Sequence, residues 1–211
     1  SALYNRGFVK LEVKDFQGAI SDFTKVLEIN QSDEYVFYNR GLAKFDLEDF
    51  EGAISDYTKA IEIDPSDPKF FHARGLVKGR LNDFSSAIDD FTKAIELNPN
   101  NDSCFYDRAI THGKLNEYSA AINDLTKAID INPEDDKYFY ARGSLEAYLG
   151  NHDSAIADQT KAIDINPEND EYFDSRARSR SSLKDYDSAI ADQTKAIEIN
   201  PHNRTYYSNR G

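Results

Sequence analysis

Residues 154–167 read SAIADQTKAIDINP and residues 188–201 read SAIADQTKAIEINP, so one phrase occurs twice, 34 residues apart, with a single Asp-to-Glu change. Steps of 34 towards the N-terminus find related stretches beginning at residues 119, 85, 51 and 17. A fixed period of this length indicates a repeat architecture. Each copy is then one member of a stack and presents the same surfaces to its neighbours, which accounts for the near-identity of the copies.

Each repeat is predicted to be a hairpin of two helices, here called A and B. In the second repeat, residues 35–47 carry aromatic and aliphatic side chains at spacings that fit a helix better than a strand. Residues 50–63 show a second helical pattern, and Pro65 follows as a stop signal. Proline returns at this register at residues 99, 133, 167 and 201.

Small side chains recur at one position in each helix. Helix A carries Gly7, Gly41, Gly75 and Gly143, with Ala109 and Ala177 in the other two repeats. Helix B carries Ala19, Ala53, Ala87, Ala121, Ala155 and Ala189. Because glycine inside a helix costs about 1 kcal/mol relative to alanine, its recurrence needs a packing reason. We expect the two helix backbones to approach closely there.

These features resemble the tetratricopeptide repeat family, as do the closing proline and the aromatic residue before helix B at Phe16, Phe50, Phe84, Tyr118 and Tyr186. The resemblance covers the whole chain. It implies an all-α fold, a right-handed α-solenoid of 34-residue helix-turn-helix repeats with six full repeats and a partial seventh. The expected bounds within this single array are 1–33, 34–67, 68–101, 102–135, 136–169, 170–203 and the partial 204–211.

The last two full repeats depart from this pattern. A large aromatic side chain in helix B is present as Phe23, Tyr57 and Phe91, then becomes Leu125, Gln159 and Gln193. His152 also stands where most other repeats have Phe or Tyr. We expect these repeats to be less well packed and to open first.

Two opposite charges recur with the period. Helix A carries Arg6, Arg40, Arg74, Arg108, Arg142 and Arg176, and helix B carries Asp22, Asp56, Asp90, Asp124, Asp158 and Asp192. The pattern predicts partly buried, bidentate ion pairs between the two helices. An arginine site for an anionic ligand is the alternative, but strict periodicity favours a structural ladder. The equally periodic Thr-Lys pairs, such as Thr58 and Lys59, are interpreted as a solvated outer face.

The candidate chemical groups do not gather into a recognisable site. His72, His112, His152 and His202 fall at four different repeat positions, whereas a metal site needs three or four convergent ligands. Cys104 is interpreted as a small core residue. The sequence has no phosphate-binding loop, serine elbow or catalytic constellation. We therefore predict no metal, no cofactor and no enzymatic activity.

Charge and hydropathy exclude further classes of partner. The formal net charge of −13 argues against nonspecific nucleic-acid binding, which needs positive charge to neutralise phosphates. No apolar run approaches the length of a membrane span. The chain begins within a repeat and ends at Gly211 in a helix, so we expect a fragment of a longer protein or missing flanking segments.

In the tetratricopeptide family, helix A residues line an inner groove that binds peptides. The resemblance places there Tyr4, Phe8, Tyr35, Tyr38, Leu42, Phe45, Lys69, His72, Gly79, Arg80, Tyr106, Gly113, Lys114, Lys137, Tyr140 and Tyr148. The first two repeats offer aromatic side chains, and the next three offer Lys and Arg. Because Gly79 and Gly113 remove side chains, we hypothesise a shallow pocket walled by Tyr106 and Tyr140 and rimmed by positive charge.

The leading hypothesis is a non-catalytic scaffold whose concave groove binds a protein or peptide segment with an acidic stretch beside an aromatic or aliphatic anchor. A second is head-to-tail self-assembly through uncapped ends, where Tyr206 and Tyr207 expose an apolar face. A third is a regulatory arm of a larger multidomain enzyme. The family's carboxylate clamp for chaperone tails is not expected, because Tyr4, Phe8 and Ala73 replace the polar and basic residues that it needs.

Overall fold

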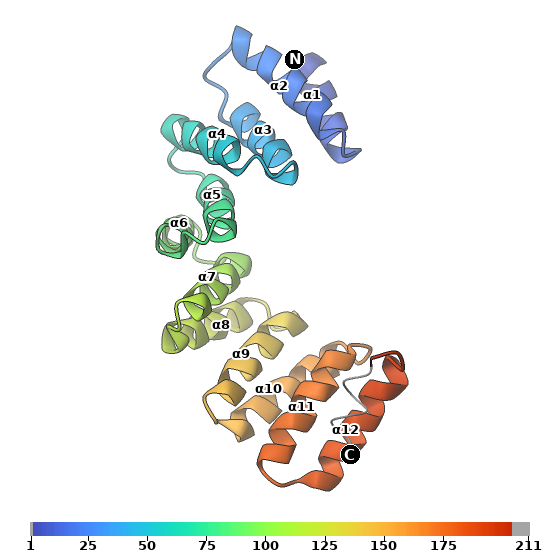
Figure 1. Ribbon diagram of the computed structural model, residues 1–211. Helices are drawn as coiled ribbons and strands as arrows, with labels where there is room; N and C mark the ends of the chain where they lie inside the picture. The colour runs from blue at the N-terminus through green and yellow to red at the C-terminus, as the bar shows by residue number, and fades with distance from the viewer. Residues whose placement is uncertain (1, 204–211) are drawn as a thin grey trace. The chain divides into compact units, whose positions relative to one another are not determined.

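The computed structural model describes residues 2–203, and this part of the chain forms twelve α-helices and no strand (Figure 1). The A helices are α1 (Ala2–Glu12), α3 (Glu34–Asp46), α5 (Pro68–Arg80), α7 (Asp102–Lys114), α9 (Asp136–Tyr148) and α11 (Asp170–Ser182). The B helices are α2 (Phe16–Ile29), α4 (Phe50–Ile63), α6 (Phe84–Leu97), α8 (Tyr118–Ile131), α10 (His152–Ile165) and α12 (Tyr186–Ile199). The predicted all-α repeat fold is confirmed. The predicted partial repeat 204–211, with Tyr206 and Tyr207, lies outside the described residues.

Contacts divide the chain into an N-terminal unit, Ser1–Leu115, and a C-terminal unit, Asn116–Gly211. Within each unit, an A helix packs on the B helix of its own repeat, and that B helix packs on the A helix of the next. The prediction that 1–211 forms one array with the stated repeat bounds stays a prediction.

The turn between helices A and B has the same backbone form in successive repeats. Lys14, Glu48, Asn82, Asn116 and Lys184 all have φ near +60°, and Gly150 has φ of +83° at the same register. An acidic side chain then caps most of the B helices: the Asp49 side chain, for example, accepts a hydrogen bond from the backbone N–H of Gly52. Such a cap satisfies an N–H group that the helix itself leaves unpaired.

A glycine of helix A faces the aromatic ring of helix B in the first three repeats. A Cβ atom on Gly41 would lie 2.6 Å from Cε1 of Tyr57, a side chain that is only 1% exposed. Gly7 faces Phe23 and Gly75 faces Phe91 in the same way. The glycine is therefore kept for the close approach of a helix backbone to a ring.

The periodic arginine and aspartate residues form bidentate ion pairs. Arg40 donates from Nε and Nη2 to the two carboxylate oxygens of Asp56, at 2.9 and 2.6 Å. The same geometry joins Arg6 to Asp22, Arg74 to Asp90, Arg142 to Asp158 and Arg176 to Asp192. Arg108 and Asp124 belong to different units, so their pairing stays a prediction.

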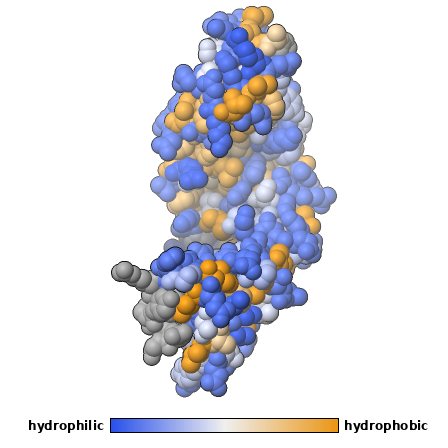
Figure 2. All heavy atoms as spheres, turned by 90° about the vertical axis from the view of Figure 1, so that its right-hand side faces the viewer, coloured by the Kyte–Doolittle hydropathy of each residue, from blue (hydrophilic) through white to orange (hydrophobic). Residues whose placement is uncertain are grey.

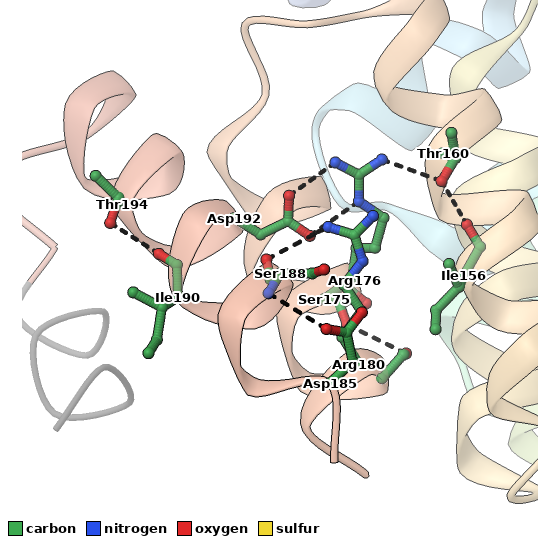
Figure 3. A network of polar contacts seen from close by, with 11 residues as sticks. Ile156, Thr160, Ser175, Arg176, Arg180, Asp185, Ser188, Ile190, Asp192 and Thr194 are labelled. Atoms are coloured by element: carbon green, nitrogen blue, oxygen red, sulfur yellow. Dashed lines mark hydrogen bonds and ion pairs between the residues drawn. The ribbon is translucent and has the colours of Figure 1, made fainter. Parts of the chain in front are cut away.

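A second cation joins several of these buried carboxylates. Lys44 Nζ lies 2.8 Å from Asp56, and Arg180 lies 2.7 Å from Asp192 (Figure 3). The aspartate side chains are nearly inaccessible; Asp56, for example, is 2% exposed. In the first repeat, the Arg6 hydrogen bond holds the pKa of Asp22 well below its usual range despite burial. This carboxylate thus stabilises the fold at neutral pH, and its contribution is lost on acidification below the ordinary aspartate pKa.

The interpretation of the threonines as a purely solvated face is wrong. Arg40 also donates from Nη1 to Thr24 of the preceding repeat, at 3.1 Å. Arg74, Arg108, Arg142 and Arg176 make the same bond to Thr58, Thr92, Thr126 and Thr160. Each of these arginines therefore ties neighbouring repeats together. The expected helical pairing of the adjacent lysines is present, with Lys59 lying 2.6 Å from Glu62.

Gln159 and Gln193 stand where the first three repeats have an aromatic ring, and they place buried polar atoms in the C-terminal unit. Gln159 is fully buried and donates from Nε2 to Ser175, and Gln193 donates to Asp174. The Oε1 atoms of both glutamines have no hydrogen-bond partner among the described residues. An unsatisfied buried acceptor costs stability. The expectation that these repeats open first stays a prediction.

Candidate functional site

The A helices carry the sixteen residues predicted from the sequence to line a binding groove. Seven of them are exposed: Phe8, Tyr35, Lys69, Arg80, Lys114, Lys137 and Tyr148. Nine are partly buried: Tyr4, Tyr38, Leu42, Phe45, His72, Gly79, Tyr106, Gly113 and Tyr140. The N-terminal unit holds all but Lys137, Tyr140 and Tyr148.

One repeat position forms a row of aliphatic and aromatic side chains on successive A helices of the N-terminal unit. Phe8, Leu76 and Ile110 are 43%, 38% and 40% exposed. Leu42 holds the same position on α3 and packs partly into the core beside Tyr57. We call these four residues the apolar row. Figure 2 shows one face of the molecule, on which apolar residues form separate patches among polar ones.

The predicted aromatic residues are fixed by contacts between repeats. Tyr4 packs against the Phe23 ring, and its hydroxyl accepts a hydrogen bond from the buried Asn39. Tyr35 donates to Asp67 at 2.8 Å, and this bond raises the pKa of the Tyr35 phenol to about 12. Both Tyr35 and Tyr38 contact the Phe70 ring. These aromatic side chains therefore have a packing role in addition to any contact with a partner.

A small hollow of about 160 Å³ lies among α5, α6 and α7. Gly79, Arg80 and Lys114 line it, and a Cβ atom added to Gly79 would meet nothing within 4 Å. Asp107 also lines the hollow. Asp107 is not among the groove residues predicted from the sequence, because the family pattern does not count its repeat position among them. The positive rim is thus offset by one carboxylate.

His72 and Asp107 connect two successive A helices. His72 Nε2 and Asp107 Oδ2 are 2.6 Å apart. Burial lowers the pKa of His72, whereas hydrogen bonds to Asp107 and to the nearby Cys104 raise it. The hydrogen bonds outweigh burial, so the pKa of His72 is about 9. His72 is therefore protonated at neutral pH and forms a charged link with Asp107.

We expect this link to make stability fall as the solution becomes alkaline. The folded-state pKa of about 9 lies above the unfolded value of 6.5, so the added stability is fully present below pH 6.5 and is lost as the pH rises through 9. Urea unfolding between these pH values should show a loss of about 1–2 kcal/mol that the His72→Gln variant lacks. Equal pH slopes for parent and variant would contradict this assignment.

The C-terminal unit contains its own part of the predicted surface. The Tyr140 and Tyr172 rings are 4.7 Å apart, and the Tyr118 and Tyr148 rings are 5.1 Å apart. The hypothesised pocket between Tyr106 and Tyr140 has one wall in each unit, so it stays a prediction.

Residues 2–203 contain neither a metal-binding cluster nor a membrane-spanning helix. This part of the chain holds no cluster of three or more His, Cys, Asp or Glu side chains placed to bind a metal ion. None of its helices is both long and apolar enough to cross a lipid bilayer.

Family models of the tetratricopeptide repeat match nearly the whole chain. One matches residues 35–67, a second matches 106–170, and a third matches 1–33, 68–101 and 171–203. The chain therefore belongs to the tetratricopeptide repeat family. No curated protein matches it.

Solved structures show the same fold at low sequence identity. The C-terminal part of a TPR repeat-containing protein from Cytophaga hutchinsonii is 18% identical, with a TM-score of 0.85 over 98% of this chain and 83% of that one. YrrB, described as "a TPR protein with an unusual peptide-binding site", is 24% identical, with a TM-score of 0.75 over 88% and 96%. MamA from Desulfovibrio magneticus RS-1 is 20% identical, with a TM-score of 0.75 over 81% and 97%.

These repeats are typically a non-catalytic fold for protein interactions. The family assignment and the structural neighbours therefore support a protein-interaction scaffold, with proteins or peptides as its partners.

Proposed function

We propose that the A-helix surface of the N-terminal unit binds a segment of another protein that carries aliphatic or aromatic anchors beside acidic residues. The apolar row supports the proposal, because Phe8, Leu76 and Ile110 are exposed at one register on α1, α5 and α7, and the partly buried Leu42 holds that register on α3. Isolated exposed apolar residues are ordinary, whereas a regular row of them is typical of a binding surface.

The charges beside the row indicate acidic residues in the partner. Arg80 and Lys114 are exposed next to Leu76 and Ile110, in a chain whose net charge is −13. Asp107 faces the same hollow, but it is already hydrogen-bonded to His72. Charge complementarity of this kind steers association and selects among partners. The peptide-binding site described for YrrB adds support by fold analogy alone.

The experiment selects short peptides on the full chain and measures their affinities by fluorescence polarisation. Selected peptides should combine an apolar anchor with Asp or Glu. Ile110→Ser is expected to lower the affinity for the selected peptides about tenfold, which corresponds to the loss of one anchor contact that binding would bury. Reversing Lys114 to Glu should weaken binding and reduce its salt dependence.

Two control variants test for general damage to the surface. Ile190→Ser removes an aliphatic side chain on α12 that is 50% exposed, and Lys25→Glu reverses an exposed charge on α2. Both should bind the selected peptides as the parent does. Equal weakening by Ile190→Ser and Ile110→Ser would contradict the proposed surface, as would selection of peptides without acidic residues.

A further inference from the structure

A second row of exposed residues runs beside the apolar row on the same A helices. It consists of the residues four positions further along each helix, and we call it the charged row: Glu12, Asp46, Arg80 and Lys114. Residues four apart are neighbours on one face of a helix, so each member of the charged row lies beside one member of the apolar row. All four charged residues are exposed, and the two rows therefore belong to one surface.

The charge of this row reverses between α3 and α5. Glu12 on α1 and Asp46 on α3 are acidic, whereas Arg80 on α5 and Lys114 on α7 are basic. None of the four forms an ion pair with another residue of 2–203. On the same helix as Asp46, Lys44 is instead held by a buried carboxylate. The charged row thus keeps its charges available for a partner.

Packing between repeats does not require this reversal. Charges that stabilise the fold recur unchanged, because every repeat packs in the same way, and the arginine of the ion-pair ladder is present in all six repeats. The charged row instead changes sign within the N-terminal unit, and its register holds the uncharged Tyr148 and Ser182 in the C-terminal unit. The order of charges can therefore serve to select a partner.

The acidic and basic halves of the row are far enough apart to act separately. Successive A helices of the N-terminal unit are in contact (Figure 1), and helices that pack together lie about 8–10 Å apart. The middle of the acidic half is then on the order of 20 Å from the middle of the basic half, more than twice the Debye length of about 8 Å at physiological ionic strength. A charge in a bound segment consequently responds mainly to the A helix beneath it.

We propose that the segment bound along the apolar row is dipolar and lies in one direction, with its acidic residues against Arg80 and Lys114 and its basic residues against Glu12 and Asp46. The opposite direction would place like charges against each other, which disfavours it. This inference rests on the proposed function, because it specifies the charges of the partner on that same surface. A segment that crosses all four A helices spans about 30 Å, which about nine extended residues cover.

The first experiment compares two peptides of about twelve residues with blocked ends, the same composition and the same apolar anchors. In one peptide the lysines and glutamates are segregated at opposite ends, and in the other they alternate. Fluorescence polarisation at physiological salt should show at least about fivefold tighter binding of the segregated peptide to the full chain. Equal affinities that both fall in Ile110→Ser would overturn this inference alone. Binding that does not depend on Ile110 would contradict the proposed function and this inference together.

A paramagnetic label shows where each end of the segregated peptide lies. A nitroxide at the basic end should broaden amide resonances of α1 and α3, and a nitroxide at the acidic end should broaden those of α5 and α7. The peptide is made in both sequence orders, because side-chain charges do not fix the direction of its backbone. The reverse assignment, or broadening of all four helices by both labels, would overturn the inference.

Charge reversal on the protein supplies a matched control. Glu12→Lys with Asp46→Lys makes the whole row basic, so the segregated peptide should lose at least about fivefold in affinity, and a peptide with glutamates at both ends should gain as much. Glu28→Lys with Glu51→Lys makes the same change of net charge at exposed positions on α2 and α4 and should leave the preference for the segregated peptide unchanged. A similar loss in both variants would assign the effect to net charge and overturn the inference.

Discussion

Asp56→Ala should destabilise the protein by about 3–5 kcal/mol, because removing one member of a buried ion pair leaves the other charge uncompensated. Asp56 is 2% exposed and holds two cations, Arg40 at 2.6 Å and Lys44 at 2.8 Å. Both cations would remain in partly buried positions, with side-chain exposures of 16% and 18%. Urea unfolding of the full chain, followed by circular dichroism, measures the change.

A matched control removes an exposed member of an ion pair on the same helix. Glu62 pairs with Lys59 at 2.6 Å, but both side chains are more than half exposed, so Glu62→Ala should cost at most about 0.5 kcal/mol. Similar losses in the free energy of unfolding for Asp56→Ala and Glu62→Ala would contradict a special stabilising role for the buried Asp56 ion pairs.

Gly41→Ala is expected to destabilise the protein by about 2–3 kcal/mol, although alanine is the better helix former, because overpacking a filled core forces side chains off their preferred positions. The new Cβ would lie 2.6 Å from Cε1 and 2.9 Å from Cδ1 of Tyr57. That ring is almost completely buried and also contacts Tyr38, so it has little room to move.

Gly79→Ala should stabilise the protein, whereas Gly41→Ala should destabilise it. A Cβ there meets nothing within 4 Å, so the substitution should stabilise the helix by about 0.5–1 kcal/mol. Thermal unfolding of both variants separates backbone propensity from steric conflict. Tyr57→Leu should largely relieve Gly41→Ala by opening space, and a double variant no more stable than the sum of its parts would refute the steric explanation.

Much of the fold could be predicted from the period of 34 residues. Helices expected over 35–47 and 50–63 are observed at Glu34–Asp46 and Phe50–Ile63. The period and the charges together also indicated which arginine and aspartate should pair, because both recur at the same position in every repeat and each repeat packs in the same way. Local patterns of apolar residues determine where such helices begin and end.

The side-chain contacts between repeats were less accessible to sequence reasoning. The bond from Arg40 to Thr24 was missed because a threonine on an exposed helix face needs no explanation by itself. Asp107 was missed because its importance depends on His72, which lies in another helix. The hollow of about 330 Å³ that Ser175 lines depends on side chains from α9, α10 and α11, and their convergence becomes visible only in three dimensions.

The arginine contacts also bear on how such a protein evolves. Each of the arginines that bonds to threonine reaches only its own hairpin or the hairpin immediately before it. Duplication or deletion of a whole repeat in the gene therefore supplies or removes donors and acceptors together. The nearly identical stretches 154–167 and 188–201 are the kind of sequence on which unequal recombination acts. A repeat family built this way can change its length in single steps without passing through an intermediate that has orphaned charges.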